Sequence, residues 1–402
     1  MTDIEILDVL SLPGGAELTL GRDGHGIAID THAEAEVAIE GGAGRGAFEG
    51  LLHLLRAGEP QGAFSFLRLS DVPEATGERP IDVDQSNRSV VVGDRVVVKV
   101  FPRTTRGPQP ALDLPAHLAE VGFGAMPTPF GAVIWTDRDG TPVVVATASA
   151  YLAGARDGWD WYLELLLGWL AGEVDDETTF EPATPVGELA GALHAALATA
   201  SSVLTSPVSF VDEEAILGWK TRAEVALDEA LALTGGEEGE RLRGREGRIR
   251  SAFDVFDQVP TAAAMRIHGD LHVGQILRWD GGDAVTDFDG NPLAPPEVRV
   301  ARDSPVRDVA SLVRSVDHMG RIAQRRGAGS VEDIERWVER SRALVVEGYV
   351  RSLDRAGQLS LFEPTLLFPL EVAQVCHEYA YAARYLPSWL RVPDLALQAI
   401  FP

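Results

Sequence analysis

The chain has 402 residues and a formal net charge of −26, with 45% hydrophobic and 24% charged residues. This length is more than one hydrophobic core usually fills, so we expect two or three domains or lobes. The negative charge argues against nucleic-acid backbones and anionic membranes as partners.

The first section, residues 1–80, alternates short apolar runs with turns of Gly, Asp and His. This alternation predicts short strands, among them residues 16–20 and 26–30, and a helix is expected near residues 46–57. The polar stretch 70–80 contains two prolines and is expected to be a linker. No catalytic pattern occurs here.

A β-hairpin is predicted over residues 90–100, where two runs of valine flank Gly93-Asp94. Its second strand carries Lys99, one of only two lysines in a chain with 33 arginines. Kinases hold the lysine that contacts the ATP phosphates on a strand of this kind. A compact ammonium acts as a point charge, which the planar guanidinium of arginine does not reproduce. We therefore predict that Lys99 binds phosphate; a surface lysine on a strand is the alternative.

One helix and two strands complete the section 81–150. The helix is expected from Pro110, with Asp113 in its first turn, and the strands at residues 131–136 and 141–146. A small sheet with one helix matches the nucleotide-binding lobe of a kinase.

A polar run before the hairpin is the candidate nucleotide loop. The cofactor-binding candidates in it are Ser86, Asn87 and Arg88. Small polar side chains and backbone N–H groups can cap phosphates, and the arginine adds charge. An ordinary Asx turn explains the same run equally well.

From residue 151 onward the pattern is mostly helical, because apolar residues recur at spacings of three and four. The predicted helices are residues 159–171, 186–200, 213–233, 307–322, 331–353 and 365–386. The charged, glycine-rich run 235–247 is expected to be an exposed connection between helices. The section 151–402 is therefore predicted as one helical lobe.

A loop and hairpin interrupt this helical section with the most specific chemical pattern in the chain. Asp270 lies in the loop, Gln275 follows five residues later, and Asp287 ends the hairpin twelve residues after that. This is the spacing of a kinase phosphotransfer centre, in which Asp270 accepts or orients the proton of an acceptor hydroxyl. Gln275 and Asp287 offer oxygens to Mg²⁺, which takes few carboxylates alongside phosphates and water. A polar hairpin loop with chance Asp and His residues is the alternative.

Several stretches together resemble one group of bacterial kinases. They are residues 85–90, 98–101, 266–277, 287–292 and 303–310. The whole chain resembles the maltokinases and glucosamine kinases, which share the protein-kinase-like fold of the aminoglycoside phosphotransferases. The resemblance implies an α+β, bilobal fold with a small N-lobe β-sheet, a mostly helical C-lobe and an extra N-terminal cap subdomain in residues 1–80.

By position, the resemblance implies a role for each motif residue. Asp270 is the catalytic aspartate, and Gln275 and Asp287 are the Mg²⁺ ligands. Lys99 contacts the phosphates of ATP. Asp113 takes the acidic position that pairs with this lysine, where relatives often carry the longer glutamate.

Three further residues are expected to support the catalytic loop. Asp308 resembles the helix-starting aspartate that steadies this loop. The alternative, that Asp308 is an ordinary helix N-cap, gives it nearly the same role. His268 and His272 are expected to orient the loop rather than to act on the substrate.

The acceptor is suggested by departures from the maltokinase pattern. Residues 287–292 read Asp-Phe-Asp-Gly-Asn-Pro, where maltokinases usually carry Asp-Phe-Glu-Gly-Glu-Pro, and so they are closer to the glucosamine kinases. Residues 374–389 also resemble the acceptor wall of the glucosamine kinases. The predicted substrate residues of this wall are Gln374, Glu378, Tyr381 and Trp389. The first three share one helix face with Tyr385, and an amphipathic core helix with polar caps is the alternative.

A protonated sugar amine needs carboxylate or carbonyl acceptors in a partly dry site. The candidate carboxylates are Asp289, Asp317 and Glu378. We therefore predict an ATP- and Mg²⁺-dependent kinase of a small amino sugar, converting glucosamine to glucosamine 6-phosphate. The alternatives are a maltokinase, an aminoglycoside-type kinase and a non-catalytic nucleotide-binding regulator; retention of the whole motif set speaks against the last.

The single cysteine, Cys376, has no partner for an intramolecular disulfide, which fits a reducing compartment. We find no secretion signal and no stretch of about 20 apolar residues that predicts a membrane span. We expect a cytoplasmic monomer or homodimer whose partner is a small-molecule sugar.

Overall fold

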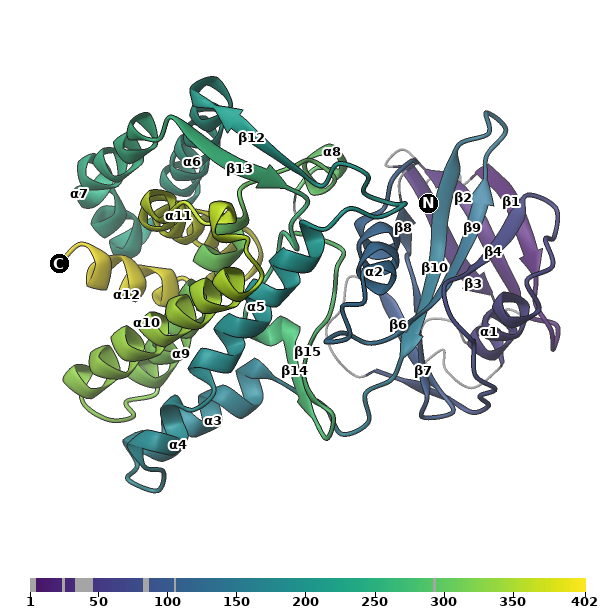
Figure 1. Ribbon diagram of the computed structural model, residues 1–402, viewed down its shortest axis with the longest axis horizontal. Helices are drawn as coiled ribbons and strands as arrows, with labels where there is room; N and C mark the ends of the chain where they lie inside the picture. Colours follow the sequence, from purple (N-terminus) through teal and green to yellow (C-terminus); the bar gives the residue numbers. More distant parts are fainter. Residues whose placement is uncertain (1–4, 24–25, 33–45, 82–86, 105, 292–293) are drawn as a thin grey trace. The chain divides into compact units, whose positions relative to one another are not determined.

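The computed structural model of the protein describes residues 5–23, 26–32, 46–81, 87–104, 106–291 and 294–402 (Figure 1). The chain divides into two compact units. The first unit contains Met1–Ala155, Ser201–Val203 and Asp287–Val300, and the second contains Arg156–Ala200, Leu204–Thr286 and Ala301–Pro402. Strands dominate the first unit and helices the second, so the expected α+β class is confirmed.

The strands described in the first unit form two antiparallel sheets. One has the order β1-β2-β3-β8, with β1 (Glu5–Ser11), β2 (Glu17–Asp23), β3 (Gly26–His32) and β8 (Arg103–Thr104). The other has the order β4-β9-β10-β7-β6-β5, with β4 (Phe64–Arg68), β9 (Pro129–Thr136), β10 (Pro142–Ala150), β7 (Val96–Val100), β6 (Arg88–Val92) and β5 (Glu78–Pro80). The strands expected at residues 16–20, 26–30, 131–136 and 141–146 are confirmed.

The larger sheet runs across the boundary expected at residue 80. β4 belongs to the predicted cap, yet it pairs with β9, and β5 pairs with β6. The division into sections 1–80, 81–150 and 151–402 stays a prediction, while the compact units change over near residue 155.

Two helices cover opposite faces of the larger sheet. α1 (Ala47–Ala57) packs Leu55 into a core with Val98 on one face. α2 (Pro110–Glu120) shares a smaller cluster, which contains Leu112 and Phe101, with the other face. Both helices were expected, and α2 carries Asp113 in its first turn as predicted.

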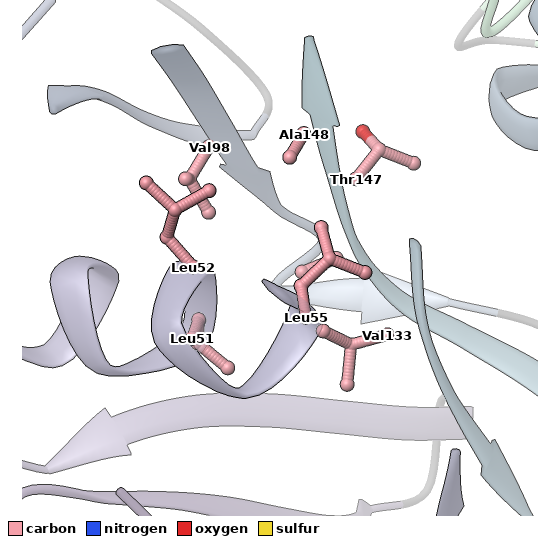
Figure 2. A pocket seen from close by; sticks show the side chains of 8 residues that line it. Leu51, Leu52, Leu55, Val98, Val133, Thr147 and Ala148 are labelled. Carbon is pink, nitrogen blue, oxygen red and sulfur yellow. The ribbon is translucent and has the colours of Figure 1, made fainter. Parts of the chain in front are cut away.

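A small gap remains between α1 and the sheet (Figure 2). Its lining residues are Leu51, Leu52, Leu55, Val98, Val133, Ala146, Thr147 and Ala148. The volume is about 10 Å³, which is the room that roughly one water molecule needs. The lining is almost wholly apolar, so this is a packing gap rather than a nucleotide site.

The predicted hairpin around Gly93 and Asp94 is confirmed, since these two residues join β6 to β7. Their φ angles are 58° and 51°, the positive pair of a type I′ turn, whose twist matches that of the strands. Side chains alternate along β7, so Lys99 lies on the face opposite Val98. On that face its ammonium lies 5.8 Å from the centre of the Phe101 ring, within the cluster that α2 covers.

The second unit is mostly helical, as expected. Its longer helices are α3 (Gly158–Leu170), α5 (Ala183–Leu197), α6 (Glu213–Leu233), α7 (Gly236–Phe253), α9 (Pro305–Arg325), α10 (Val331–Arg355), α11 (Leu367–Tyr385) and α12 (Arg391–Ile400). The short ones are α4 (Asp176–Phe180) and the 3-10 turns η1 (Asp254–Gln258), η2 (Val273–Gln275), η3 (Leu359–Leu361), η4 (Pro364–Leu366) and η5 (Pro387–Trp389). In the first unit, α8 (Pro296–Arg299) is a single turn. All six predicted helices are present, with ends within a few residues.

The expectation of an exposed connection at residues 235–247 was wrong, because helix α7 covers this run. Leu242 and Ile249 are fully buried and lie seven residues apart, so they share one face of the helix. On the solvent side, Arg250 pairs with Glu246 one turn earlier. The four glycines inside this helix conceal the helical pattern in the sequence.

Helices α5 and α10 pack closely together in this unit (Figure 1). Gly187 makes the approach possible, since a Cβ there would lie 1.9 Å from the carbonyl oxygen of Val345. One helix backbone therefore lies directly against the other, which fixes the position of residues that α5 and α10 carry.

Two small antiparallel sheets flank the predicted catalytic loop. β12 (Val208–Asp212) pairs with β13 (Thr261–Met265) just before the loop. β11 (Arg156–Asp157) pairs with β14 (Ile276–Trp279), which forms the predicted hairpin with β15 (Gly282–Val285) just after it.

Among the described residues, one segment, Leu359–Tyr385, has the length and hydropathy of a membrane span. Half of its most apolar window is buried inside the protein. Val372, Val375 and Tyr379 on α11 belong to the core of the second unit together with α6, α7 and α12. Burial in this core accounts for the apolar character of the segment.

Candidate active site

Asp308 fixes the start of the predicted catalytic loop. It lies in the first turn of α9, where Ser304 is the N-cap, so Asp308 is not itself the cap. Its carboxylate instead accepts hydrogen bonds from the backbone N–H groups of His268 (2.8 Å) and Gly269 (2.9 Å). The two residues before Asp270 are therefore held by one buried side chain.

A buried network supports Asp308 from behind. His194 on α5 contacts Asp308 Oδ2 through Nε2 at 3.1 Å and the Tyr349 hydroxyl of α10 through Nδ1 at 2.8 Å. Burial opposes ionisation of Asp308, but hydrogen bonding to His194 and to the Gly269 N–H outweighs it and lowers the pKa of Asp308. The carboxylate therefore stays charged inside the protein, held by donors from α5 and from the loop.

His268 joins the loop to the end of the hairpin. Its Nε2 lies 2.9 Å from the carbonyl oxygen of Thr286, and its Nδ1 accepts from the N–H of Asp270 at 3.3 Å. The tautomer with its proton on Nε2 satisfies both bonds. Thr286 directly precedes Asp287 in the chain, so His268 contacts the backbone beside both predicted aspartates.

Gln275 is held by the short turn η2 that follows the loop. Its backbone N–H donates to the carbonyl of His272, and its own carbonyl accepts from Thr286, both at 2.9 Å. Its side-chain amide lies 3.4 Å from Nε2 of His272. Ser315 on α9 accepts from the N–H of Val273 at 3.0 Å. These contacts fix the backbone from which Gln275 projects.

In the first unit, Lys99 lies between two carboxylates. Its Nζ is 2.7 Å from Asp287 Oδ1 and 2.6 Å from Asp289 Oδ2. Asn87 donates to the same oxygen of Asp289 at 2.9 Å. Burial opposes the charge of Lys99, but Asp289 and Asp287 outweigh it and raise the pKa of Lys99 above 10.5. A charged lysine with 19% of its side chain exposed excludes the alternative of a free surface lysine.

This cluster has the donors that Mg²⁺ prefers. Lys99, Asp287 and Asp289 together carry one net negative charge, and 43% of the Asp287 side chain is exposed. Hard carboxylate oxygens that face water suit a cation that keeps several waters and phosphate oxygens. Asp287 also has a φ of 62°, a conformation that is rare outside glycine and concentrates at functional sites.

The remaining nucleotide candidates are placed as follows. Asp113 is half-buried in α2, and its predicted pairing with Lys99 stays a prediction. Asn87 contacts Asp289, and Arg88 begins β6 with an exposed side chain. Ser86 lies outside the described residues.

The predicted acceptor wall lies on α11 and the turn after it. Gln374 and Trp389 are half-buried, and Tyr381 is 44% exposed. Glu378, with 15% of its side chain exposed, contacts His318 Nε2 through Oε2 at 2.7 Å. The wall thus offers an exposed phenol and a partly dry carboxylate from one helix.

Asp317 and Asp289 are occupied by other residues. The Asp317 side chain is 3% exposed and pairs with Arg314 at 2.5 Å and Arg321 at 2.9 Å. Burial works against its charge, but these two arginines prevail and hold the pKa of Asp317 well below its usual range. The Asp289 carboxylate pairs with Lys99 and accepts a hydrogen bond from Asn87. The prediction that Asp317 and Asp289 read a sugar amine therefore finds no support in their contacts.

Comparison with known proteins places this geometry in a family. A profile of the phosphotransferase enzyme family matches residues 77–337. The chain belongs to this phosphotransferase family. A glucosamine kinase of Streptacidiphilus jiangxiensis is 38% identical over 351 residues, 86% of this chain and 78% of that protein. A glucosamine kinase of Mycolicibacterium smegmatis is 33% identical over 400 residues, 98% of both chains.

The structural comparison agrees with this family assignment. A solved structure of glucosamine kinase in complex with glucosamine, ADP and inorganic phosphate superposes with a TM-score of 0.83 at 33% identity. It covers 100% of this chain and 94% of that one. The expected kinase-like fold of the phosphotransferase family is therefore confirmed over the whole chain.

Sequence reasoning missed several residues of the phosphotransferase site. His194 and Ser315 support the loop, and His318 contacts Glu378 and stacks on Trp159. Each stands in a helix with no catalytic motif around it. For His318, the one available signal was a histidine next to Asp317 on an otherwise buried helix.

Proposed function

We propose that the protein is an ATP-dependent kinase that converts glucosamine to glucosamine 6-phosphate. The observation that carries the proposal is likeness over the whole chain to a glucosamine kinase in complex with glucosamine, ADP and inorganic phosphate. The residues that we assign to this reaction lie in both units. In the first unit, Lys99 lies against Asp287 and Asp289. In the second, Asp270 follows His268 and Gly269, whose backbone N–H groups donate to Asp308.

Lys99 and Asp287 act on the nucleotide. The ammonium of Lys99 is a compact charge that binds phosphate oxygens. Asp289, oriented by Asn87, anchors this lysine. Asp287 and Gln275 would hold Mg²⁺, which would neutralise charge on the phosphates. Arg88 and Ser86 are proposed to lie along the phosphates, and Asp113 to support Lys99 when ATP is bound.

Asp270 acts on the acceptor. The oxygen of the sugar 6-hydroxyl forms a bond to the γ-phosphorus of ATP, the bond from that phosphorus to the bridging oxygen of ADP breaks, and the hydroxyl proton passes to Asp270. His268 and the clamp by Asp308 hold the backbone of Asp270 for this step. Positioning and proton acceptance are thus assigned to different side chains.

The acceptor wall reads the sugar. Glu378 accepts from the protonated amine, because a carboxylate with little exposure forms strong charge-assisted hydrogen bonds. Gln374, Tyr381 and Trp389 offer an amide, a phenol and an indole to the hydroxyl groups and the apolar face of the ring. We propose no role in substrate binding for Asp317.

The cellular setting follows from composition. The net charge of −26 disfavours nucleic acids and anionic membranes as partners. The proposed partner is the sugar substrate, by likeness to the glucosamine kinases. We place the reaction in the cytoplasm, where ATP and Mg²⁺ are supplied, and we propose a monomer or a homodimer.

The product tests this proposal. The purified protein is incubated with ATP, Mg²⁺ and glucosamine, and the products are analysed by ³¹P and ¹³C NMR. We expect ADP and a sugar phosphate in equal amounts, with the ester on carbon 6. Formation of ADP without a sugar ester, or an ester on the anomeric carbon, would contradict the proposal.

A further inference from the structure

Trp159, His318 and Glu378 form a continuous cluster in the second unit. The Trp159 and His318 rings stack with an interplanar angle of 14° and centroids 6.4 Å apart. His318 Nε2 then contacts Glu378 Oε2 at 2.7 Å. Three helices, α3, α9 and α11, each contribute one residue. The cluster is built from separate elements, so its geometry is set by the packing of the unit.

The tryptophan end of this cluster contacts the catalytic loop. Trp159 lies 5.8 Å from the His272 ring. A Cβ on Gly274 would come within 2.4 Å of the indole Nε1, so only glycine allows this approach. Asp157 caps α3 by accepting from the N–H of Trp159 at 2.8 Å, which fixes the start of the helix that carries the indole. The position of the Trp159 indole is therefore fixed by the catalytic loop and by the start of α3.

The carboxylate end of the cluster has little freedom. The side chains of His318 and Glu378 are 10% and 15% exposed. Glutamate loses considerable rotamer entropy when it is held in one position. The hydrogen bond from His318 occupies Oε2 alone, so Oε1 of Glu378 stays available as an acceptor.

We propose that His318 is a positioning residue that determines the preference of this enzyme for amino sugars. The inference rests on the proposed function, because it supposes that Glu378 binds the sugar amine and that His318 orients Glu378 for this contact. Stacking on Trp159 fixes the His318 ring, and the ring fixes the Glu378 carboxylate. The ammonium of the sugar then meets an acceptor that is already oriented, so little affinity is lost in ordering it.

The test compares kcat/KM for glucosamine and glucose in matched variants. Glu378→Gln removes the charge and measures how far Glu378 itself sets the preference. His318→Ala should lower the ratio of glucosamine to glucose by about tenfold, as expected for loss of one bond to a charged group. The KM for ATP should stay within about twofold, since the described contacts of His318 are to Trp159 and Glu378.

His318→Gln is the conservative variant. Its amide nitrogen reaches the position of Nε2 and restores a donor to Glu378, so it should recover much of the preference, although the stack on Trp159 is lost. His53→Ala, an exposed histidine on α1, is the control and should match the wild type.

The outcomes separate failure of the proposed function from failure of the positioning role of His318. If the wild type shows no preference for glucosamine, the proposed function fails. If the wild type prefers glucosamine and Glu378→Gln loses the preference, but folded His318→Ala keeps the wild-type ratio, the positioning role is overturned. If His318→Ala does not fold, His318→Phe replaces it, because this variant keeps a ring on Trp159 and removes the donor to Glu378. A wild-type ratio in folded His318→Phe then overturns the positioning role.

Discussion

Replacing Asp308 by asparagine should destabilise the protein and disorder the loop that carries Asp270. The carboxylate accepts from the N–H groups of His268 and Gly269 and from His194, at 2.8, 2.9 and 3.1 Å. Asparagine keeps one acceptor oxygen and turns an NH₂ group toward a donor. The amide loses at least one of these bonds outright and makes the others neutral. Hydrogen bonds to charged groups contribute about 1.5–3 kcal/mol each and neutral ones about 0.5–1.5 kcal/mol, so the total loss is about 3 kcal/mol.

This loss is measurable by thermal unfolding. For a domain of about 150–250 residues, 1 kcal/mol shifts Tm by roughly 2–4 °C, so Tm should fall by roughly 6–12 °C. Asp160→Asn is the control, because Asp160 also lies in the first turn of a helix but is exposed. It should cost less than about 1 kcal/mol. A fall of less than about 2 °C for Asp308→Asn would refute the clamp.

The pH dependence gives a second measure of the same bond network. The pKa of Asp308 is lowered from 3.8 in the folded protein. A depressed pKa stabilises the fold above the unfolded value and loses that contribution as the pH falls through the folded value. The Tm gap between wild type and Asp308→Asn should therefore stay constant from pH 7 to pH 5 and narrow only in acid below 3.8.

Three variants test the chemistry directly. Asp270→Asn should lower kcat by about 10²–10⁴-fold while ATP binding stays nearly intact, because only the proton acceptor is lost; a kcat above about a tenth of wild type would remove Asp270 from the chemistry. Lys99→Arg should be nearly inactive, since a planar fork does not fit where one nitrogen lies 2.7 and 2.6 Å from two carboxylates; full turnover would refute this. Asp289→Asn should raise the KM for ATP more than the KM for glucosamine, because Asp289 anchors Lys99. A larger increase in the KM for glucosamine would indicate that Asp289 binds the sugar.

The strands and turns of the nucleotide lobe were readable from the sequence because local rules decide them. Gly93 and Asp94 are residues that adopt positive φ, and the valines beside them prefer strands, so the hairpin and the strand of Lys99 follow directly. The helices of the second unit were predicted from apolar spacing for the same reason. The prediction for residues 235–247 was wrong because glycine and charge suggested a loop, whereas burial of Leu242 and Ile249 stabilises a helix there.

Side-chain partners were less predictable, because they depend on packing between distant segments. Asp289 was assigned to the sugar, yet Lys99, 190 positions earlier in the chain, takes its carboxylate. Asp317 was chosen for its charge, but the same helix supplies Arg314 one turn before it and Arg321 one turn after it, and these neutralise it. His318 became visible only when α9 and α11 brought it to Glu378.

The most direct test of the account is the acceptor preference of the purified protein. ATP turnover is measured with Mg²⁺ and with glucosamine, glucose, N-acetylglucosamine, maltose and an aminoglycoside as acceptors, and kcat/KM is compared. Glucosamine should exceed glucose by at least about tenfold, because a site built around a charged donor leaves its acceptors unpaired when that donor is absent. N-acetylglucosamine should be poorer still, since acetylation removes the charge and adds bulk. A clear preference for maltose would contradict the account and identify a maltokinase instead.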